Sequence, residues 1–325
     1  MTHIRGMKRM HIVSLGLGIV TIAAASRAAV GFRPTTHAVE AADLGVASSS
    51  DAMESVIDTP GPVTVETVVG ADWAVTRAGL VNLDDPKARA AHLTDGDEPI
   101  VVQFHALHHP TRGTFLVDTG IERAIGVDPK KSAFGDALVV SKFMHLEKMK
   151  VRTDTATWIA AHEKPAGVLL THLHMDHVSG MRDVPNDVPV YMGPGETRER
   201  TTLNWFVRPM TDAALEGKGP LRELQFRSDP NDREAGVSDL FGDGTVWAIW
   251  VPGHTAGSVA YVARTPKGPV LFTGDACHTA WGWKNGVEPG TFSEDRQASR
   301  KSLERLEQLV ARHPGMDVRL GHQSL

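Results

Sequence analysis

The chain has 325 residues, of which 41% are hydrophobic and 22% are charged, so it can form one large domain with a buried core. The formal net charge is −5. No excess of basic residues is available to neutralise phosphates, and this argues against a nucleic-acid partner. The single cysteine, Cys277, excludes an intramolecular disulfide framework.

The N-terminus has the composition of an export signal. Arg5, Lys8 and Arg9 precede an apolar run over residues 12–25, and small residues crowd the stretch that follows it. A basic start, a short apolar middle and a small-residue exit are typical of a signal peptide, and an uncleaved membrane anchor is the alternative. We therefore expect residues 1–29 to be one of these two. Both interpretations make the protein periplasmic or secreted, with membrane contact only through an anchor.

The rest of the chain is expected to be a linker followed by one catalytic domain. Residues 30–62 are rich in Ala, Ser, Thr, Asp and Pro without an apolar period, which predicts a flexible linker. Residues 63–325 show neither an internal repeat nor a second boundary. Asp154 is a predicted helix N-cap, and residues 294–312 form an amphipathic helix. Apolar runs predict strands over residues 63–69, 100–106, 114–117, 168–170, 245–251, 270–273 and 318–320.

Several of these strands end next to a residue that can bind a metal ion. His172 follows the strand at 168–170, His254 follows Pro-Gly, Asp275 follows Thr-Gly, and His322 follows Gly. A rigid sheet can aim side chains from the loops at its strand ends. The pattern therefore predicts one functional site that is built from distant parts of the chain.

The strongest motif is the segment 171–177, with the sequence Thr-His-Leu-His-Met-Asp-His. In an extended stretch, residues two apart point the same way, so His172 and His174 can bind one ion. If the chain then turns, Asp176 and His177 can face a second ion. Imidazole and carboxylate groups are ligands that zinc accepts without a thiolate.

This motif resembles the H-x-H-x-D-H signature of the metallo-β-lactamase superfamily. Asp118 after a strand, His254 in Pro-Gly-His-Thr, Asp275 in Thr-Gly-Asp and His322 in Gly-His-Gln follow in that family's order, so the resemblance covers residues 63–322. It implies an α/β fold, the αββα sandwich, with two mixed sheets face to face, outer helices and the site at one sheet edge.

The resemblance also implies a ligand set for two zinc ions. Position by position, it assigns His172, His174 and His254 to the first ion, Asp176, His177 and His322 to the second, and Asp275 to a bridge between them. Asp118 is expected to tie the ligand loop in place. Iron and manganese remain alternatives to zinc, because His and carboxylate ligands suit all three metals.

Such a centre predicts hydrolysis by a metal-bridging hydroxide. Two ions that share a carboxylate and a water lower the pKa of the water, polarise the substrate oxygen and hold the two in attack geometry. No serine or cysteine nucleophile is then needed. Asp176 is the expected proton shuttle.

A bridging Asp275 resembles the lactonase, glyoxalase II and phosphodiesterase-like branches of the family. The stretch 271–278 is similar to N-acyl-homoserine lactonases, which commonly place a tyrosine three residues after the bridging aspartate; here that position is His278. We expect His278 to donate a hydrogen bond to the substrate carbonyl, in an enzyme that opens lactones or cleaves esters. The alternatives are a phosphoester or organophosphate hydrolase, and a non-hydrolytic di-iron or ligand-sensing protein.

Apolar residues near these motifs suggest a cleft for a small molecule with an acyl or aromatic group, although ordinary core packing explains each one equally well. They are Phe134, Leu138, Phe143, Met144, Leu146, Met149, Trp205, Phe206, Met210, Trp281 and Trp283. Cys277 is expected to pack in the core. His105, His108 and His109 are expected at a strand end and turn, outside the site.

Overall fold

The computed structural model describes residues 32–135, 146–201 and 204–325. The signal peptide or anchor predicted for residues 1–29 lies outside the described residues, as do Leu138, Phe143 and Met144 of the predicted cleft wall. Among the described residues, no helix has the length and apolar character needed to cross a membrane.

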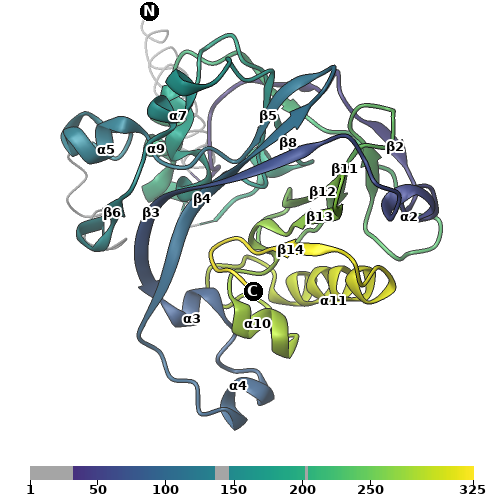
Figure 1. The fold of residues 1–325 in the computed structure, drawn as a ribbon. Helices are drawn as coiled ribbons and strands as arrows, with labels where there is room; N and C mark the ends of the chain where they lie inside the picture. The colour runs from purple at the N-terminus through teal and green to yellow at the C-terminus, as the bar shows by residue number, and fades with distance from the viewer. Residues whose placement is uncertain (1–31, 136–145, 202–203) are drawn as a thin grey trace, which may run out of the picture.

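Two mixed sheets form the centre of the molecule (Figure 1). The first sheet has the order β1 (Val39–Ala41), β9 (Leu221–Glu223), β8 (Val190–Met192), β7 (Gly167–Leu169), β5 (Gly113–Val117), β4 (Asp97–His109), β3 (Thr64–Thr76) and β6 (Lys150–Val151). The second has the order β14 (Asp317–Arg319), β13 (Gly268–Phe272), β12 (Val259–Thr265), β11 (Val246–Trp250), β10 (Val237–Asp239) and β2 (Val46–Ser48). Strands β5, β7, β8, β9 and β1 run parallel, whereas the second sheet is antiparallel except for the β13–β14 pair.

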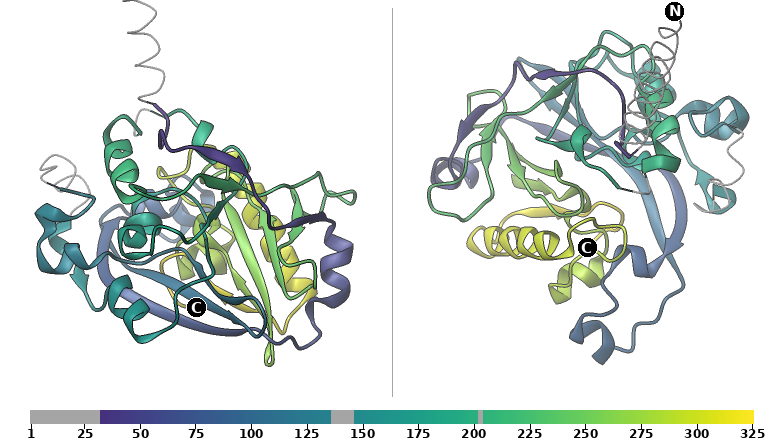
Figure 2. Two further views of the ribbon diagram at one scale, coloured as in Figure 1. Left: turned by 90° about the horizontal axis from the view of Figure 1, so that it is seen from above. Right: turned by 180° about the vertical axis from the view of Figure 1, so that it is seen from behind.

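Helices lie outside both sheets (Figure 2). The α-helices are α2 (Ser50–Ile57), α3 (Arg77–Leu80), α4 (Pro86–Ala90), α5 (Arg123–Val127), α7 (Thr155–Ala161), α8 (Met175–Val178), α9 (Asn204–Ala214), α10 (Ala280–Asn285) and α11 (Arg296–Arg312). Short 3-10 turns are η1 (Pro129–Lys131), η2 (Leu146–Lys148), η3 (Ser179–Asp183), η4 (Glu196–Arg198) and η5 (Gly274–Ala276).

Three layers of apolar side chains hold these elements together. Trp158 of α7 packs with Phe104 and Leu116 on the outer face of the first sheet. Residues such as Tyr191 and Tyr261 fill the space between the two sheets. A third layer lies under α2 and α11, where Met53, Leu306 and Ile249 meet. The predicted αββα sandwich is therefore confirmed.

The predicted helices also form. Asp295 caps α11 by accepting hydrogen bonds from the backbone N–H groups of residues 297 and 298, so the helix begins two residues later than predicted. Its Leu303, Leu306 and Leu309 are buried on one face, as the spacing predicts. The Asp154 side chain caps α7.

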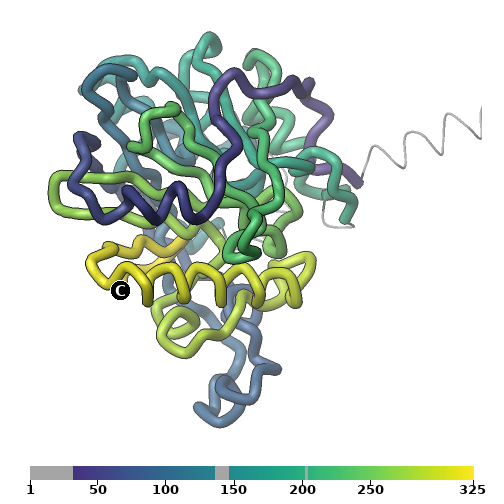
Figure 3. The backbone as a smooth tube through the Cα atoms, turned by 90° about the vertical axis from the view of Figure 1, so that its right-hand side faces the viewer, coloured from purple at the N-terminus to yellow at the C-terminus, as the bar shows by residue number. Residues whose placement is uncertain are grey.

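The linker predicted for residues 30–62 is wrong over residues 39–57. Strand β1 pairs with β9 in the first sheet and β2 pairs with β10 in the second. Met53 and Ile57 of α2 are fully buried. In Figure 3 this segment (purple) crosses one side of the molecule and α2 lies beside α11. The prediction failed because short edge strands are held by backbone hydrogen bonds and need no apolar pattern.

Candidate metal centre

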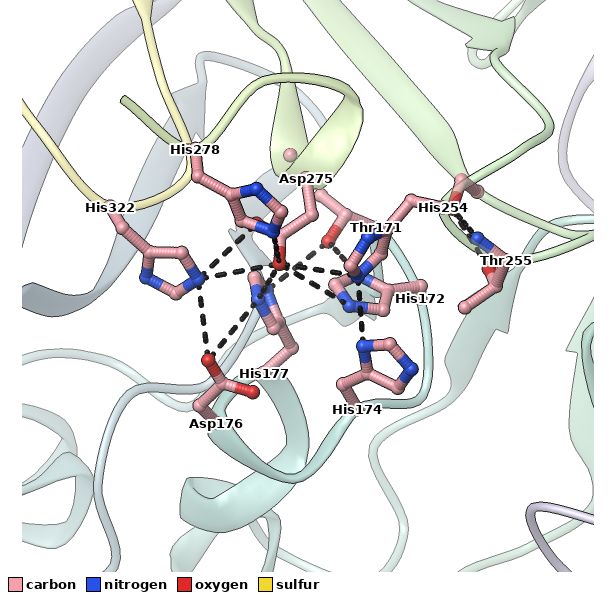
Figure 4. A network of polar contacts seen from close by, with 12 residues as sticks. Thr171, His172, His174, Asp176, His177, His254, Thr255, Asp275, His278 and His322 are labelled. Atoms are coloured by element: carbon pink, nitrogen blue, oxygen red, sulfur yellow. Dashed lines mark hydrogen bonds and ion pairs between the residues drawn. The ribbon is translucent and has the colours of Figure 1, made fainter. Parts of the chain in front are cut away.

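The loops that follow β7, β11, β13 and β14 bring the predicted ligands together (Figure 4). His174 is the N-cap of the short helix α8, which turns Asp176 and His177 toward the same space. Asp275 lies in η5 and is 4% exposed. All seven predicted ligands converge here, because each strand delivers its loop to the same edge of the sandwich.

The Asp275 carboxylate is the hub of this cluster. Its Oδ2 atom lies 3.3 Å from His177 Nε2, 3.4 Å from His254 Nε2 and 3.7 Å from His172 Nε2. Its Oδ1 atom lies 3.3 Å from His322 Nε2. Two ligands of one tetrahedral zinc ion, each at about 2.1 Å, lie about 3.4 Å apart, so these separations suit shared ions.

The donor atoms divide into groups that could each hold an ion. One group comprises His172, His174, His254 and Asp275, with ligand atoms within 4.8 Å of one another, and a second comprises Asp176, His177 and His322. In the middle, His172 Nε2, His177 Nε2 and Asp275 Oδ1 are buried and find no hydrogen-bond partner among the described residues. Buried polar atoms normally have partners, and a bound cation would supply one. The residues therefore fit a metal centre.

The electrostatics of the two groups differ. Burial, together with His177 and His174, holds the pKa of His172 well below its usual value, which leaves a neutral ring with a lone pair. Although burial opposes it, Asp275 and Asp118 raise the pKa of His177 well above its usual value. Burial likewise opposes the effect of Asp275 on His322, yet the pKa of His322 is raised to about 8. The carboxylates beside His177 and His322 thus favour positive charge in this part of the site, and they would favour a divalent cation for the same reason.

Asp118 supports the ligand loop, as the resemblance implies. Its carboxylate accepts hydrogen bonds from the Thr171 backbone N–H at 2.8 Å and from His177 Nδ1 at 2.8 Å. The second contact fixes the proton of a neutral His177 ring on Nδ1 and leaves Nε2 directed at the centre. Asp118 itself has a φ of 60°, a strained backbone for an L residue that places its side chain under the loop.

Sequence analysis missed Glu196, a fully buried carboxylate in η4. Glu196 accepts a hydrogen bond from the Leu173 backbone N–H at 2.8 Å, between two candidate ligands. It also accepts from Thr255 Oγ1 at 2.6 Å and from the Gly257 backbone N–H at 3.0 Å, just after His254. The sequence signal that could have identified Glu196 is its position directly after an apolar run and a Gly-Pro-Gly turn.

His278 lies against the hub and is 1% exposed. Its Nε2 atom is 3.0 Å from Asp275 Oδ2, and its Nδ1 atom donates to the Leu80 carbonyl at 3.0 Å. The predicted hydrogen bond to a substrate carbonyl needs a proton on Nε2, whereas this contact places the single proton of a neutral ring on Nδ1. The neighbouring Cys277 packs in the core, as predicted.

The predicted cleft wall assembles only in part. Phe134 and Met210 line a small apolar pocket together with Met175, the residue between His174 and Asp176. Leu146, Met149, Trp281 and Trp283 pack against the cores as partly buried residues. Trp205 and Phe206 are exposed on α9. His105, His108 and His109 lie on β4, where they contact Thr67, Thr114 and Asp243 and join none of the clusters of candidate ligands among the described residues.

Comparison with known proteins agrees with this geometry. Residues 100–312 match the model of the Metallo-beta-lactamase superfamily. The N-acyl homoserine lactonase AttM of Azorhizobium caulinodans is 29% identical over 230 residues, covering 70% of this chain and 83% of that protein. The probable metallo-hydrolase YqgX of Bacillus subtilis is 34% identical over 118 residues, covering 34% of this chain and 51% of that protein.

Solved structures share the fold at low identity. A quorum-quenching N-acyl homoserine lactone lactonase superposes with a TM-score of 0.56 at 16% identity, covering 82% of this chain and 93% of that one. A probable metal-dependent hydrolase from Staphylococcus aureus gives a TM-score of 0.57 at 12% identity, covering 81% and 90%. The chain therefore belongs to the metallo-beta-lactamase superfamily, as a metal-dependent hydrolase of that fold.

Proposed function

We propose that this protein is a dinuclear metal-dependent hydrolase that opens lactones or cleaves related esters. The observation that carries the proposal is the position of Asp275 between two groups of buried ligand atoms. We assign His172, His174 and His254 to the first ion, Asp176, His177 and His322 to the second, and Asp275 to the bridge. The ligand types favour zinc, and they also suit iron or manganese.

When bound, the two ions would supply Lewis acidity, which activates water and polarises the substrate carbonyl. The chain's own residues position this chemistry. Asp118 orients the His177 ring, and burial of the hub excludes bulk water from Asp275. Asp176 is the more exposed carboxylate, and its Oδ2 atom lies 3.3 Å from His322 Nε2. We propose that Asp176 carries a proton to the leaving oxygen of the substrate.

The substrate class rests on the relatives. The AttM relatives, which align over 70% of this chain, are named N-acyl homoserine lactonases. The pocket lined by Phe134, Met175 and Met210 lies directly beside the ligand loop. This pocket is too small to hold a whole acyl chain, so it offers an apolar contact beside the ligand loop rather than a binding cleft.

The ligand assignment predicts that His172→Ala and His254→Ala each lose about one metal ion per chain and nearly all hydrolysis. The reason is that both side chains belong to the first group, where removing one donor leaves too few ligands. Elemental analysis of protein purified without added metal would count the ions. A panel of lactones, aryl esters and phosphotriesters would identify the reaction.

The matched control is His92→Ala, which removes an exposed histidine outside the ligand groups. It should keep both ions and the full rate. If His172→Ala or His254→Ala also keeps two ions and full activity, the ligand map is refuted. Phosphotriester turnover without lactone or ester turnover would contradict the substrate class while leaving the metal centre intact.

We also propose that residues 1–29 direct export, because Arg5, Lys8 and Arg9 precede the apolar run. Fractionation of expressing cells should find the protein outside the cytoplasm, either shortened near residues 25–29 or held in the membrane. Replacing Arg5, Lys8 and Arg9 by Glu should retain it inside the cell. An intact, soluble cytoplasmic product of the unaltered chain would defeat the proposal.

A further inference from the structure

We infer that His278 is an additional metal ligand, binding through Nε2 the ion that Asp275 and His322 share. The inference rests on the proposed dinuclear centre and deepens it. In this role His278 binds a metal ion instead of donating a hydrogen bond to the substrate. Removing its side chain should weaken metal binding in the first case and leave metal binding unchanged in the second.

The first step concerns the proton on the His278 ring. A backbone carbonyl can only accept a hydrogen bond, so the 3.0 Å contact from Nδ1 to Leu80 O requires a proton on Nδ1. The neutral ring then carries a lone pair on Nε2. An Nδ1–H bonded to a carbonyl, with Nε2 free, is the usual arrangement of a histidine that binds a metal.

The second step concerns what faces that lone pair. His278 Nε2 lies 3.0 Å from Asp275 Oδ2, and the two side chains are 1% and 4% exposed. A lone pair and a carboxylate oxygen repel each other at this distance unless a proton or a metal ion lies between them. Burial removes the water that would otherwise weaken the repulsion. The contact is therefore suited to a shared positive ion.

The third step is a comparison with His322, a ligand implied by the family motif. His322 Nδ1 donates to the Val101 carbonyl at 2.9 Å, and its Nε2 faces Asp275 at 3.3 Å, which repeats the contacts of His278. The two rings are nearly parallel, with centroids 5.6 Å apart and an interplanar angle of 11°. Figure 4 shows both rings directed at Asp275 from the same side. The contacts that suit His322 Nε2 to an ion at Asp275 are therefore also made by His278.

The backbone holds the two histidines in this arrangement. The His322 N–H donates to the His278 carbonyl at 3.2 Å, and the Gly321 N–H donates to the Cys277 carbonyl at 3.1 Å. A Cβ atom at Gly321 would lie 2.2 Å from Asp275 Oδ1, so only glycine allows this approach. Asp275, His278 and His322 form a group whose ligand atoms lie within 4.8 Å of one another.

The test compares metal binding by the full chain and its variants, stripped of metal and reloaded with Zn²⁺ or Co²⁺. The affinity of the second ion is measured by competition with a chelator, and the Co²⁺ absorption bands report its ligands. His278→Phe should bind the second ion at least about tenfold more weakly and shift the bands. His278→Gln should lose less, because its amide can donate to Leu80 and offers an oxygen ligand.

The matched control is His105→Phe, which replaces a buried histidine outside the ligand groups and should keep the affinity of the unaltered chain. Equal losses in both Phe variants would overturn the inference, since they would reflect a general loosening of the fold. Unchanged metal affinity and unchanged Co²⁺ bands in His278→Phe would also overturn the inference. If that protein then has a lower kcat, the result supports hydrogen-bond donation to the substrate instead. If the unaltered chain itself binds fewer than two ions, the dinuclear proposal fails first.

Discussion

At the scale of single residues, Glu196 joins the two loops that carry the proposed ligands of the first ion. One carboxylate oxygen accepts from the Leu173 N–H, and the other accepts from Thr255 and the Gly257 N–H. A Cβ atom at Gly257 would lie 2.6 Å from the Glu196 side chain, so the close approach depends on glycine. Burial raises the pKa of Glu196, and these hydrogen bonds oppose the rise.

Glu196→Gln should therefore weaken binding of the first ion, although Glu196 is not one of the proposed ligands. The glutamine amide has one oxygen, so its NH₂ group must face either the Leu173 N–H or the Gly257 N–H. A buried donor left without an acceptor costs about 1–3 kcal/mol, and displaced supporting groups typically lower metal affinity roughly 10–100-fold. Chelator competition and urea unfolding would measure the two effects.

The control for this variant is Glu199→Gln, a neighbouring half-buried carboxylate that accepts one hydrogen bond, from the Ala256 N–H. The amide oxygen of glutamine can keep that bond, so metal affinity should stay unchanged. Equal metal affinity in Glu196→Gln and the unaltered chain would show that Glu196 does not position the ligands.

The sequence predicted the ligands because their signals are local. The spacing of His172, His174, Asp176 and His177 lies within one short segment, and the later ligands each follow an apolar run and a glycine. The contacts of Glu196, and the contact of His278 with Leu80, join positions far apart in the chain. Such contacts exist only after folding, and no pattern of spacing contains them.

At the scale of elements, the strands that precede ligands were predicted because buried strands are continuous apolar runs. The ends of other predicted strands differ by a few residues: β4 extends from Asp97 to His109, beyond the apolar run at 100–106. Pairing with β3 along its length continues the strand through polar residues. Backbone pairing, unlike burial, does not require apolar side chains, so it cannot be recognised from the sequence pattern.

Other strands were not predicted for related reasons. The strands β1, β2, β9 and β10 have three residues each, too few to show a period of two. The first five residues of strand β12 form a buried apolar run, yet a short run of this kind fits a buried helix equally well. Its place between β11 and β13 is decided by tertiary packing.

At the scale of the whole molecule, a cluster of charges joins α2, α11 and the chain before β10. Arg312 of α11 donates to Glu54 of α2 at 2.8 and 3.0 Å. Glu234 lies beneath this pair and is 1% exposed, with Arg312 4.0 Å away. Within the described part of the chain, neither of its carboxylate oxygens has a hydrogen-bond partner. Burial raises the pKa of Glu234 to about 8, although Arg312 and Arg305 oppose the rise.

This raised pKa predicts that the protein loses stability as the pH increases. Between the unfolded value of 4.5 and the folded value of about 8, the folded state keeps the Glu234 proton and the unfolded state releases it. The free energy of unfolding then falls by about 1.4 kcal/mol per pH unit from this group. Below the unfolded value the contribution is constant. Glu234→Gln carries no ionisable group, so it should remove this part of the decline.

Urea unfolding at several values between pH 5 and pH 8, at fixed free metal, should show Glu234→Gln gaining stability over the unaltered chain as the pH rises, by a few kcal/mol across the window. Glu54→Gln is the matched control. Burial opposes it, but the hydrogen bond to Arg312 lowers the pKa of Glu54, so the stabilisation from Glu54 is complete above the unfolded value of 4.5 and is lost only as the pH falls. Glu54→Gln should therefore destabilise the protein over the same window, by an amount that varies with pH only as far as loss of the Glu54 charge lowers the pKa of Glu234. If the Glu234→Gln curve runs parallel to that of the unaltered chain, the buried carboxyl does not titrate differently in the two states, and the predicted pH dependence has another source.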